Sequence, residues 1–330
     1  MRQLRPGAVT GVGSLPHRDA RAAAEFSLAM SPELTFVPTL PRRSPAENMI
    51  AQAVSGIRGV DFGQYGSLSV DVRRVDPLAP VVTDLDHDAY LGMRSFVEVA
   101  AGRATAVKWQ FVGPISLGVA LMRAGVPASP AFAVAVRAVR QHVQVIHRYI
   151  ADALPGCEQV VVLDEPSFPD VMDDGFPLPP DAAIDLLSGA LAVIEPMTVA
   201  GVHCCGDADW AGIIAAGPEL LSLPVRRDLL GIAGYLARFL DRGGIIVWGA
   251  VPTDGPIFHS PQRHWRELTG LWEGLTAAGC DRDRLIGQAL LSPECGLGMH
   301  GESVANGVFN VVGELSQRIR GRLLTHSGLG

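Results

Sequence analysis

The sequence predicts one α/β domain with the (β/α)8 TIM-barrel fold over residues 1–330. Short apolar runs that end in Gly, Pro, Asp or Ser alternate with longer stretches of helical periodicity, which is the pattern of repeated β-α units around a parallel sheet. Several runs are continuous in Val, Ile and Leu, as expected for strands covered on both faces. Hydrophobic residues make up 48% of the chain, enough to bury one large core.

Eight apolar runs are predicted to be the strands of the barrel. They are 8–14, 34–40, 106–113, 159–165, 197–205, 219–225, 244–250 and 284–291. The segment 59–87, rich in Asp, Gly and Ser, does not fit the alternation and is predicted to be an insertion between the second and third strands. Because the parallel strands of a barrel end on one face, residues that carry chemistry are expected at the ends of these runs or just beyond them.

Start and stop signals delimit several of the predicted helices. The start signals are Ser129-Pro130, Asp181 and Ser260-Pro261, each followed by helical periodicity, as expected for N-caps and first-turn prolines. The stop signals are Gly243-Gly244 and Gly279, since a residue with left-handed backbone commonly ends a helix. The stretch 302–324 is predicted to be the closing helix.

Charge and composition exclude several classes of function. The net charge is −7, Lys108 is the only lysine, and the arginines are scattered along the chain, so no nucleic-acid partner is expected. The N-terminus lacks the apolar core of a signal peptide, and no stretch approaches the ~20 apolar residues that cross a bilayer. A cytoplasmic protein that does not bind membranes is therefore expected. Its five cysteines then favour metal ligands or reactive thiols over disulfides.

The strongest local signal is Val202-His203-Cys204-Cys205-Gly206, at the end of the fifth predicted strand. The i, i+2 spacing points His203 and Cys205 to the same side of a strand. Imidazole nitrogen and thiolate are ligands that Zn²⁺ prefers. Cys295, just beyond the eighth run, is available as a third ligand. The alternative is that these are small buried residues beside an ordinary histidine at a strand end.

The fourth predicted strand ends in two adjacent carboxylates, Asp164 and Glu165, and is stopped by Pro166. Adjacent side chains face opposite sides of a strand, so only one carboxylate can point into the barrel mouth. There it would hold a substrate ammonium or act as an acid or base, while the other would cap a following turn or pair with an arginine. A simple turn with a helix-capping Asp is the alternative.

Two further strand ends carry candidate substrate-binding residues. Thr10-Gly11-Val12-Gly13-Ser14 places glycines and a hydroxyl at the first strand end, where backbone amides can receive a carboxylate or phosphate; taken alone, it is a turn. Lys108 and Gln110 put a cation and an amide on one face of the third strand. The alternative for Lys108 is a snorkelling side chain beside a Gly-Pro turn.

The order of these motifs along the chain is more specific than any one of them. The series is G-S-x-P at the first strand, K-x-Q-x-x-G-P at the third, D-E-P at the fourth, H-x-C at the fifth and S-P-E-C-G-L after the eighth. It resembles the C-terminal catalytic barrel of cobalamin-independent methionine synthase over nearly the whole chain. More distantly, it resembles the barrels of uroporphyrinogen decarboxylase and of corrinoid-dependent methyltransferases.

The resemblance implies a zinc-dependent methyltransferase. In that family zinc binds the thiol of homocysteine as a thiolate and presents it to the methyl group of methyltetrahydrofolate. The resemblance assigns His203, Cys205 and Cys295 as metal ligands, Ser14 to the amino-acid carboxylate, and Asp164 to the amino group. The expected partners are thus a small-molecule thiol and a methyl donor, either methyltetrahydrofolate or a corrinoid carrier.

The sequence departs from the family in three places. The family's fourth ligand, a glutamate at the end of the sixth strand, has no counterpart in 220–225, leaving Glu294 or Asp207 as candidates to replace it. The acidic residues that follow the family's second strand are only loosely matched by 46–49, and the N-terminal barrel of the large enzymes is missing. Two rival functions stay open: a binding or regulatory protein without catalysis, and a metal-free decarboxylase of the uroporphyrinogen type.

Overall fold

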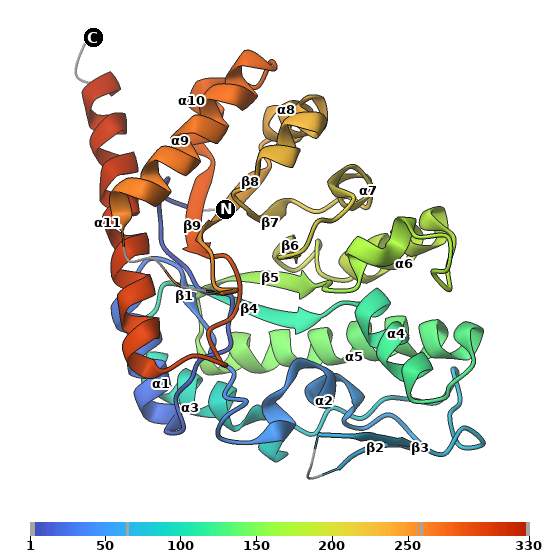
Figure 1. Cartoon of the computed structure of the whole chain (residues 1–330). Helices are drawn as coiled ribbons and strands as arrows, with labels where there is room; N and C mark the ends of the chain where they lie inside the picture. The colour runs from blue at the N-terminus through green and yellow to red at the C-terminus, as the bar shows by residue number, and fades with distance from the viewer. Residues whose placement is uncertain (1–3, 64–65, 256, 258–259, 328–330) are drawn as a thin grey trace.

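The chain adopts an α/β fold built on a curled sheet of seven parallel strands (Figure 1). The computed structural model describes residues 4–63, 66–255, 257 and 260–327. In spatial order the strands are β1 (Thr35–Phe36), β4 (Ala106–Val112), β5 (Glu158–Asp164), β6 (Val199–His203), β7 (Leu220–Pro224), β8 (Ile245–Val251) and β9 (Ala289–Pro293). Consecutive strands of the sheet are neighbours, which is the β-α alternation that the sequence predicts.

The first predicted strand, 8–14, is not a regular strand, and this corrects the prediction of eight. It makes isolated parallel bridges, from Val9 to Leu291 on β9 and from Ser14 to Thr39 beyond β1. Two glycines account for the irregularity. A Cβ on Gly11 would lie 2.6 Å from the Phe36 ring, and Gly13 has a φ of +147°. The segment therefore joins both edges of the sheet through isolated bridges and a few main-chain hydrogen bonds instead of a continuous ladder.

The last predicted strand, 284–291, is displaced along the chain. Its first residues belong to helix α10 (Arg282–Gly287), and β9 begins only at Ala289. The Asp281 side chain accepts a hydrogen bond from the Arg284 backbone N–H at 2.9 Å, an N-cap that starts a helix at this point. Cys295 consequently lies two residues beyond the end of β9.

Helices connect the strands and pack outside the sheet (Figure 1). The α-helices are α1 (Ala20–Met30), α2 (Met49–Val54), α3 (Leu91–Ala100), α4 (Pro114–Arg123), α5 (Ala128–Ala153), α6 (Pro180–Leu191), α7 (Trp210–Ala215), α8 (Ala233–Asp241), α9 (Pro261–Ala277), α10 and α11 (Glu302–Ser327). Short 3₁₀ helices are η1 (Pro45–Glu47), η2 (Asp88–Tyr90), η3 (Phe168–Met172) and η4 (Arg227–Ile232). No helix in the described ranges combines the length and apolar character needed to cross a bilayer.

Side-chain alternation divides the inner face of the sheet into an apolar and a polar end. Near the amino ends, one apolar cluster draws from six of the seven strands, from segment 8–14 and from Leu34 just before β1: Ala8, Leu34, Ala106, Val160, Val162, Val199, Leu220, Val247 and Leu290. Because strand side chains repeat every second residue, the same faces continue into Lys108, Gln110, Asp164, His203 and Ser222 at the carboxyl ends. The interior is thus filled with hydrocarbon at one end and presents polar groups at the other, where barrels carry their sites.

The segment predicted to be an insertion, 59–87, contains a separate hairpin. Strands β2 (Val60–Phe62) and β3 (Leu68–Val70) pair antiparallel with each other and lie apart from the main sheet (Figure 1). The buried His142 of α5 joins this segment to helix α2. Its Nδ1 lies 2.9 Å from Thr83 Oγ1, and its Nε2 lies 3.2 Å from the Ala53 carbonyl oxygen. A neutral imidazole satisfies both contacts, with one nitrogen accepting and the other donating.

His142 predicts a pH dependence of stability. Burial lowers its pKa from 6.5 to about 4. Between these two pKa values the unfolded chain binds a proton at His142 that the folded chain does not. The contribution of neutral His142 to the free energy of unfolding is therefore complete above pH 6.5 and is lost as the pH falls from 6.5 to about 4. We expect the stability advantage of the wild type over His142→Gln to shrink by about 3 kcal/mol between pH 7.5 and pH 4. Urea unfolding of both proteins across this range tests it, and parallel curves would contradict it.

Candidate metal centre

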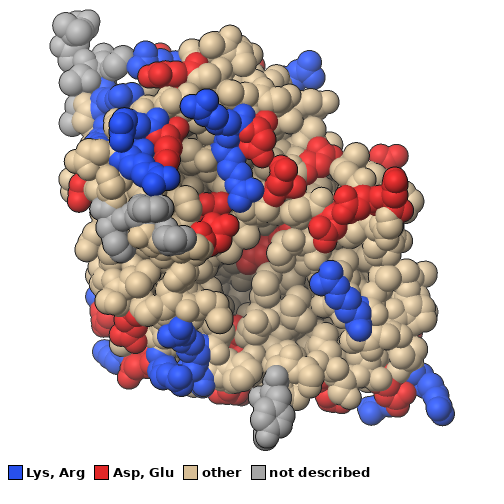
Figure 2. All heavy atoms as spheres, viewed as in Figure 1, with Lys and Arg blue, Asp and Glu red and all other residues tan. Residues whose placement is uncertain are grey.

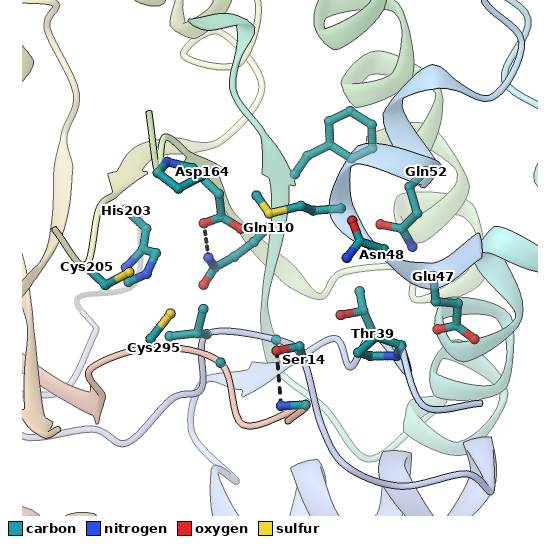
Figure 3. Close-up of a pocket in the computed structure, with 18 of the residues that line it drawn as sticks. Ser14, Thr39, Glu47, Asn48, Gln52, Gln110, Asp164, His203, Cys205 and Cys295 are labelled. Carbon is teal, nitrogen blue, oxygen red and sulfur yellow. Dashed lines mark hydrogen bonds between the residues drawn. The ribbon is translucent and has the colours of Figure 1, made fainter. Parts of the chain in front are cut away.

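Three soft ligands converge at the carboxyl end of the sheet. His203 is the last residue of β6, Cys205 lies two residues further on, and Cys295 follows β9. One ligand atom from each residue, an imidazole nitrogen and two Sγ atoms, lies within 4.8 Å of the others. Figure 3 shows the two sulfurs and the imidazole gathered at one side of the cavity. A tetrahedral zinc site separates its ligand atoms by about 3.5–4 Å, so small side-chain adjustments suffice to hold an ion.

The imidazole of His203 is oriented by a neighbouring strand. Its Nδ1 lies 2.9 Å from Ser222 Oγ, the residue directly opposite it on β7. Its Nε2 is buried and has no hydrogen-bond partner among the described residues. Metal-binding histidines commonly hydrogen-bond through the other ring nitrogen, and a buried unpaired nitrogen is costly. The donor set and the unpaired Nε2 therefore both fit a zinc ion.

The two sulfurs form a coupled pair. A hydrogen bond with Cys295, supported by the nearby His203, lowers the pKa of Cys205 to about 4. The same hydrogen bond and burial raise the pKa of Cys295. The shared hydrogen bond thus favours the thiolate form of Cys205, while Cys295 keeps its proton and donates the hydrogen bond. Cys204 is different: it does not belong to the ligand group, and burial raises its pKa to about 12.

Neither predicted replacement for a fourth ligand joins the group. The strand that carries the glutamate in the family, β7, ends here in Pro224. Among the described residues, the group that could hold a metal ion consists of His203, Cys205 and Cys295. The Glu294 carboxylate instead accepts a hydrogen bond from Arg226 Nη2 at 3.0 Å. Three protein ligands are the usual number in catalytic zinc sites, where the fourth position is left for a water or a substrate.

Asp164 is the carboxylate at the end of β5 that lines the cavity, beside Gln110 of β4 (Figure 3). Gln110 Nε2 donates a hydrogen bond to Asp164 Oδ1, and Lys108 Nζ donates to Gln110 Oε1 and, at 2.8 Å, to the Gly11 carbonyl. An ammonium only donates, so Lys108 fixes which end of the Gln110 amide faces Asp164. Burial raises the pKa of Asp164, while His203 and Lys108 oppose that shift.

Lys108 itself does not line the cavity. Its side chain is 1% exposed, and burial lowers its pKa against the opposing effect of Asp164. The predicted substrate contact of Lys108 would therefore have to act through Gln110, which does line the cavity.

Glu165 points away from the cavity and caps helix α4. Its fully buried carboxylate accepts hydrogen bonds from the Ile115 N–H at 2.9 Å, the Ser116 N–H at 2.8 Å and Ser116 Oγ at 2.7 Å. A Cβ on Gly113 would lie 2.2 Å from the carboxylate, which explains the glycine of the G-P motif. Burial raises the pKa of Glu165 against these hydrogen bonds. Of the two predicted catalytic carboxylates, only Asp164 faces the mouth.

Ser14 joins the start of the chain to the loop that carries Cys295. Its carbonyl accepts a hydrogen bond from the Leu297 N–H at 2.8 Å, and its Oγ accepts one from the Gly298 N–H at 3.4 Å. A Cβ on Gly296 would lie 2.0 Å from Ser14 Oγ, so the glycines after Cys295 allow this close approach. Ser14 lines the cavity, where the resemblance expects it.

The cavity next to the ligands has a volume of about 320 Å³ and opens where the face in Figure 2 is hollowed, with acidic side chains on the rim. Opposite the sulfurs, the wall carries Thr39, Asn48 and Gln52 (Figure 3). Glu47 also reaches this wall, but its carboxylate accepts hydrogen bonds from Arg43 Nε at 2.6 Å and the Leu40 N–H at 2.8 Å. The negative charge of Glu47, the acidic residue after β1, is thus paired with Arg43 within the protein.

Solved structures with the same fold include the kind of protein that the motif order resembles. The chain is similar to a methyltransferase from Methanosarcina mazei, with a TM-score of 0.59 and 14% identity over 96% of this chain and 94% of that one. It is also similar to a B12-independent methionine synthase from Shewanella sp. W3-18-1 in complex with selenomethionine, with a TM-score of 0.58 and 16% identity over 97% and 99% of the two chains. The predicted resemblance is confirmed at the level of fold. No protein-family model and no curated sequence matches the chain.

Several residues of the site were not predicted from the sequence. Ser222 had a detectable signal, because it is the one polar residue in the run Leu220–Pro224 and parallel pairing of adjacent strands places it opposite His203. Thr39 and Gln52 had none, since polar residues after a short strand are ordinary in loops, whereas Asn48 lies in the stretch 46–49 that loosely matches the family. Arg226 also had no signal, because nothing in the sequence distinguishes it from the other arginines scattered along the chain.

Proposed function

We propose that this protein is a zinc-dependent methyltransferase that transfers a methyl group to a thiol such as homocysteine. One observation carries the proposal: an unpaired buried imidazole nitrogen and two sulfurs meet at the carboxyl end of the sheet. The methyl donor is expected to be methyltetrahydrofolate or a corrinoid carrier. The Shewanella neighbour supports the choice of substrate, because it is a methionine synthase and was solved with a selenium analogue of methionine.

His203, Cys205 and Cys295 would hold the metal. A bound Zn²⁺ lowers the pKa of a coordinated thiol, which supplies a nucleophile at neutral pH without a separate base. Ser222 fixes the ring of His203 through Nδ1, so that Nε2 faces the ligand cluster. The protein thus presents a prearranged donor set to the ion, next to a cavity large enough for a small thiol.

Asp164 and Ser14 would orient the acceptor. The Asp164 carboxylate is fixed by Gln110, which leaves its other lone pairs for an ammonium group of the substrate. The Ser14 hydroxyl lines the cavity and accepts a hydrogen bond from the Gly298 N–H, so its own O–H would be able to donate to a substrate carboxylate. Binding both ends of an amino-acid thiol would align its sulfur for in-line attack on the methyl group.

Metal content and methyl transfer test the function. Wild-type protein purified without chelator should contain about one zinc per chain, as a single three-ligand site predicts. It should transfer methyl groups to homocysteine from methyltetrahydrofolate or methylcobalamin. Wild-type protein without any transition metal would contradict the proposal. Bound zinc with no turnover from either donor would favour the binding-protein alternative.

Asp164→Asn tests the assignment of the amino group. Losing a charge-assisted hydrogen bond should lower kcat/KM for homocysteine by roughly 100-fold, while the zinc content stays unchanged. 4-Mercaptobutyrate, which lacks the amino group, is the control substrate, and the wild type and the variant should methylate it at similar rates. An equal loss with both thiols would show that Asp164 serves another step.

A further inference from the structure

We propose that Arg226 is a positioning residue that ties together the two loops carrying the metal-binding sulfurs. The inference rests on the zinc site of the proposed function and assigns a role to a side chain outside the ligand set. Arg226 follows β7, between the strand ends that supply Cys205 and Cys295. One of its nitrogens reaches both sides: Nη2 donates to the Cys205 carbonyl oxygen at 3.0 Å and to Glu294 Oε1 at 3.0 Å.

The Cys295 side of this connection is firmly anchored. The Glu294 N–H donates to the Val251 carbonyl at 2.9 Å, and the Leu297 N–H donates to the Ser14 carbonyl at 2.8 Å. The chain at Glu294 also passes so close to Gly249 that an added Cβ there would lie 2.8 Å from Glu294 Cα. Main-chain hydrogen bonds on both sides of Cys295 therefore fix its position independently of any metal.

The Cys205 side is held less by the sheet. Among the described residues, the last sheet hydrogen bond before Cys205 runs from the Cys204 N–H to the Ser222 carbonyl at 3.2 Å, and the chain then leaves β6. The contact from Arg226 falls on the carbonyl of Cys205 itself. Arg226 thus links the backbone of Cys205 to the anchored Glu294, and this link keeps the Cys205 sulfur close to the Cys295 sulfur.

The same contact explains why Glu294 is not the missing fourth ligand. Its side chain is 8% exposed and its carboxylate pairs with the Arg226 guanidinium. A buried carboxylate that lost this partner would be left without compensation for its desolvation. Glu294 is therefore an anchor for Arg226 and not a metal ligand.

Zinc affinity, measured by competition with a chromophoric chelator, tests the proposal. Residues that orient metal ligands typically contribute roughly ten- to a hundredfold in metal affinity, and Arg226→Ala should weaken zinc binding by that factor. Arg226→Lys should keep most of the wild-type affinity, because one ammonium can donate to both acceptors. Arg227→Ala, at the exposed neighbouring arginine, is the matched control and should bind zinc as the wild type does.

Two further measurements separate positioning from general stability. In cobalt-substituted protein the thiolate-to-metal absorption of Arg226→Ala should change, whereas a purely structural role would lower the melting temperature and leave that absorption intact. Glu294→Ala should weaken zinc binding as much as Arg226→Ala, and the double variant should be no worse, because both remove one connection.

The outcomes distinguish this inference from the proposed function. Wild-type protein that binds no zinc would overturn both. Tight zinc binding by the wild type, with equal affinity and an unchanged cobalt spectrum in Arg226→Ala, would overturn the role of Arg226 and leave the metal site standing. Additive losses in the double variant would also overturn it, since they would mean that the two side chains act separately.

Discussion

Cys295→Ser is expected to lose its zinc and, with it, methyl transfer. A serine hydroxyl stays protonated at neutral pH and is a poor ligand for zinc compared with a thiolate. Protein zinc sites provide about 10–16 kcal/mol of apparent binding free energy from their full ligand set, so losing one thiolate should cost about 3–4 kcal/mol, or roughly 10²–10³-fold in affinity. Elemental analysis after gel filtration and chelator competition measure the loss. Cys205→Ser should behave in the same way.

Cys157→Ser is the matched control for both variants. Cys157 is half-buried just before β5, at the opposite end of the strand from Asp164, and burial raises its pKa to about 11. The variant should retain its zinc and its activity. Retention of zinc by both Cys205→Ser and Cys295→Ser would show that these sulfurs are not the ligands, and the methyltransferase proposal would then fail.

Glu165→Ala is expected to destabilise the fold rather than to remove a reacting group. It leaves the buried N–H groups of Ile115 and Ser116 at the start of α4 without their acceptor. Each unsatisfied buried donor costs about 1–3 kcal/mol, so the free energy of unfolding should fall by about 3–5 kcal/mol. Glu165→Gln keeps one oxygen acceptor and should lose roughly half of that. Urea unfolding measures both.

Activity measured on the folded fraction separates this role from catalysis. If Glu165 only caps α4, the folded part of Glu165→Gln should methylate thiols at close to the wild-type rate. Ser116→Ala, which removes one of the three donors to the carboxylate, should show a smaller loss of stability and unchanged activity. Wild-type stability combined with a hundredfold slower Glu165→Gln would restore the catalytic role that the sequence predicted.

Most strands of the sheet could be predicted, because a buried strand is recognisable from a short apolar run in the local sequence. The runs at 106–113, 159–165, 197–205, 219–225 and 244–250 each match a strand of the structure to within two residues at either end. The predicted strands at 8–14 and 284–291 were wrong or displaced, because other local features of these segments oppose a regular strand. The glycines of 8–14 admit the Phe36 ring and a positive φ, so this segment bridges without forming a ladder. At 284–291 the Asp281 cap extends a helix into residues whose apolar character suits either structure.

The set of side chains that share the inner face of the sheet follows from the amino-acid sequence alone. Alternation along a strand is a local property, so Lys108 and Gln110 had to lie on one side of β4, and only one of Asp164 and Glu165 could face the mouth. Three features depend on tertiary packing: Asp164 is the carboxylate that faces the mouth, Lys108 lies behind Gln110, and Arg226 binds the Glu294 carboxylate. These choices depend on how separate β-α units pack against one another, and side-chain period carries no information about contacts between segments far apart in the chain.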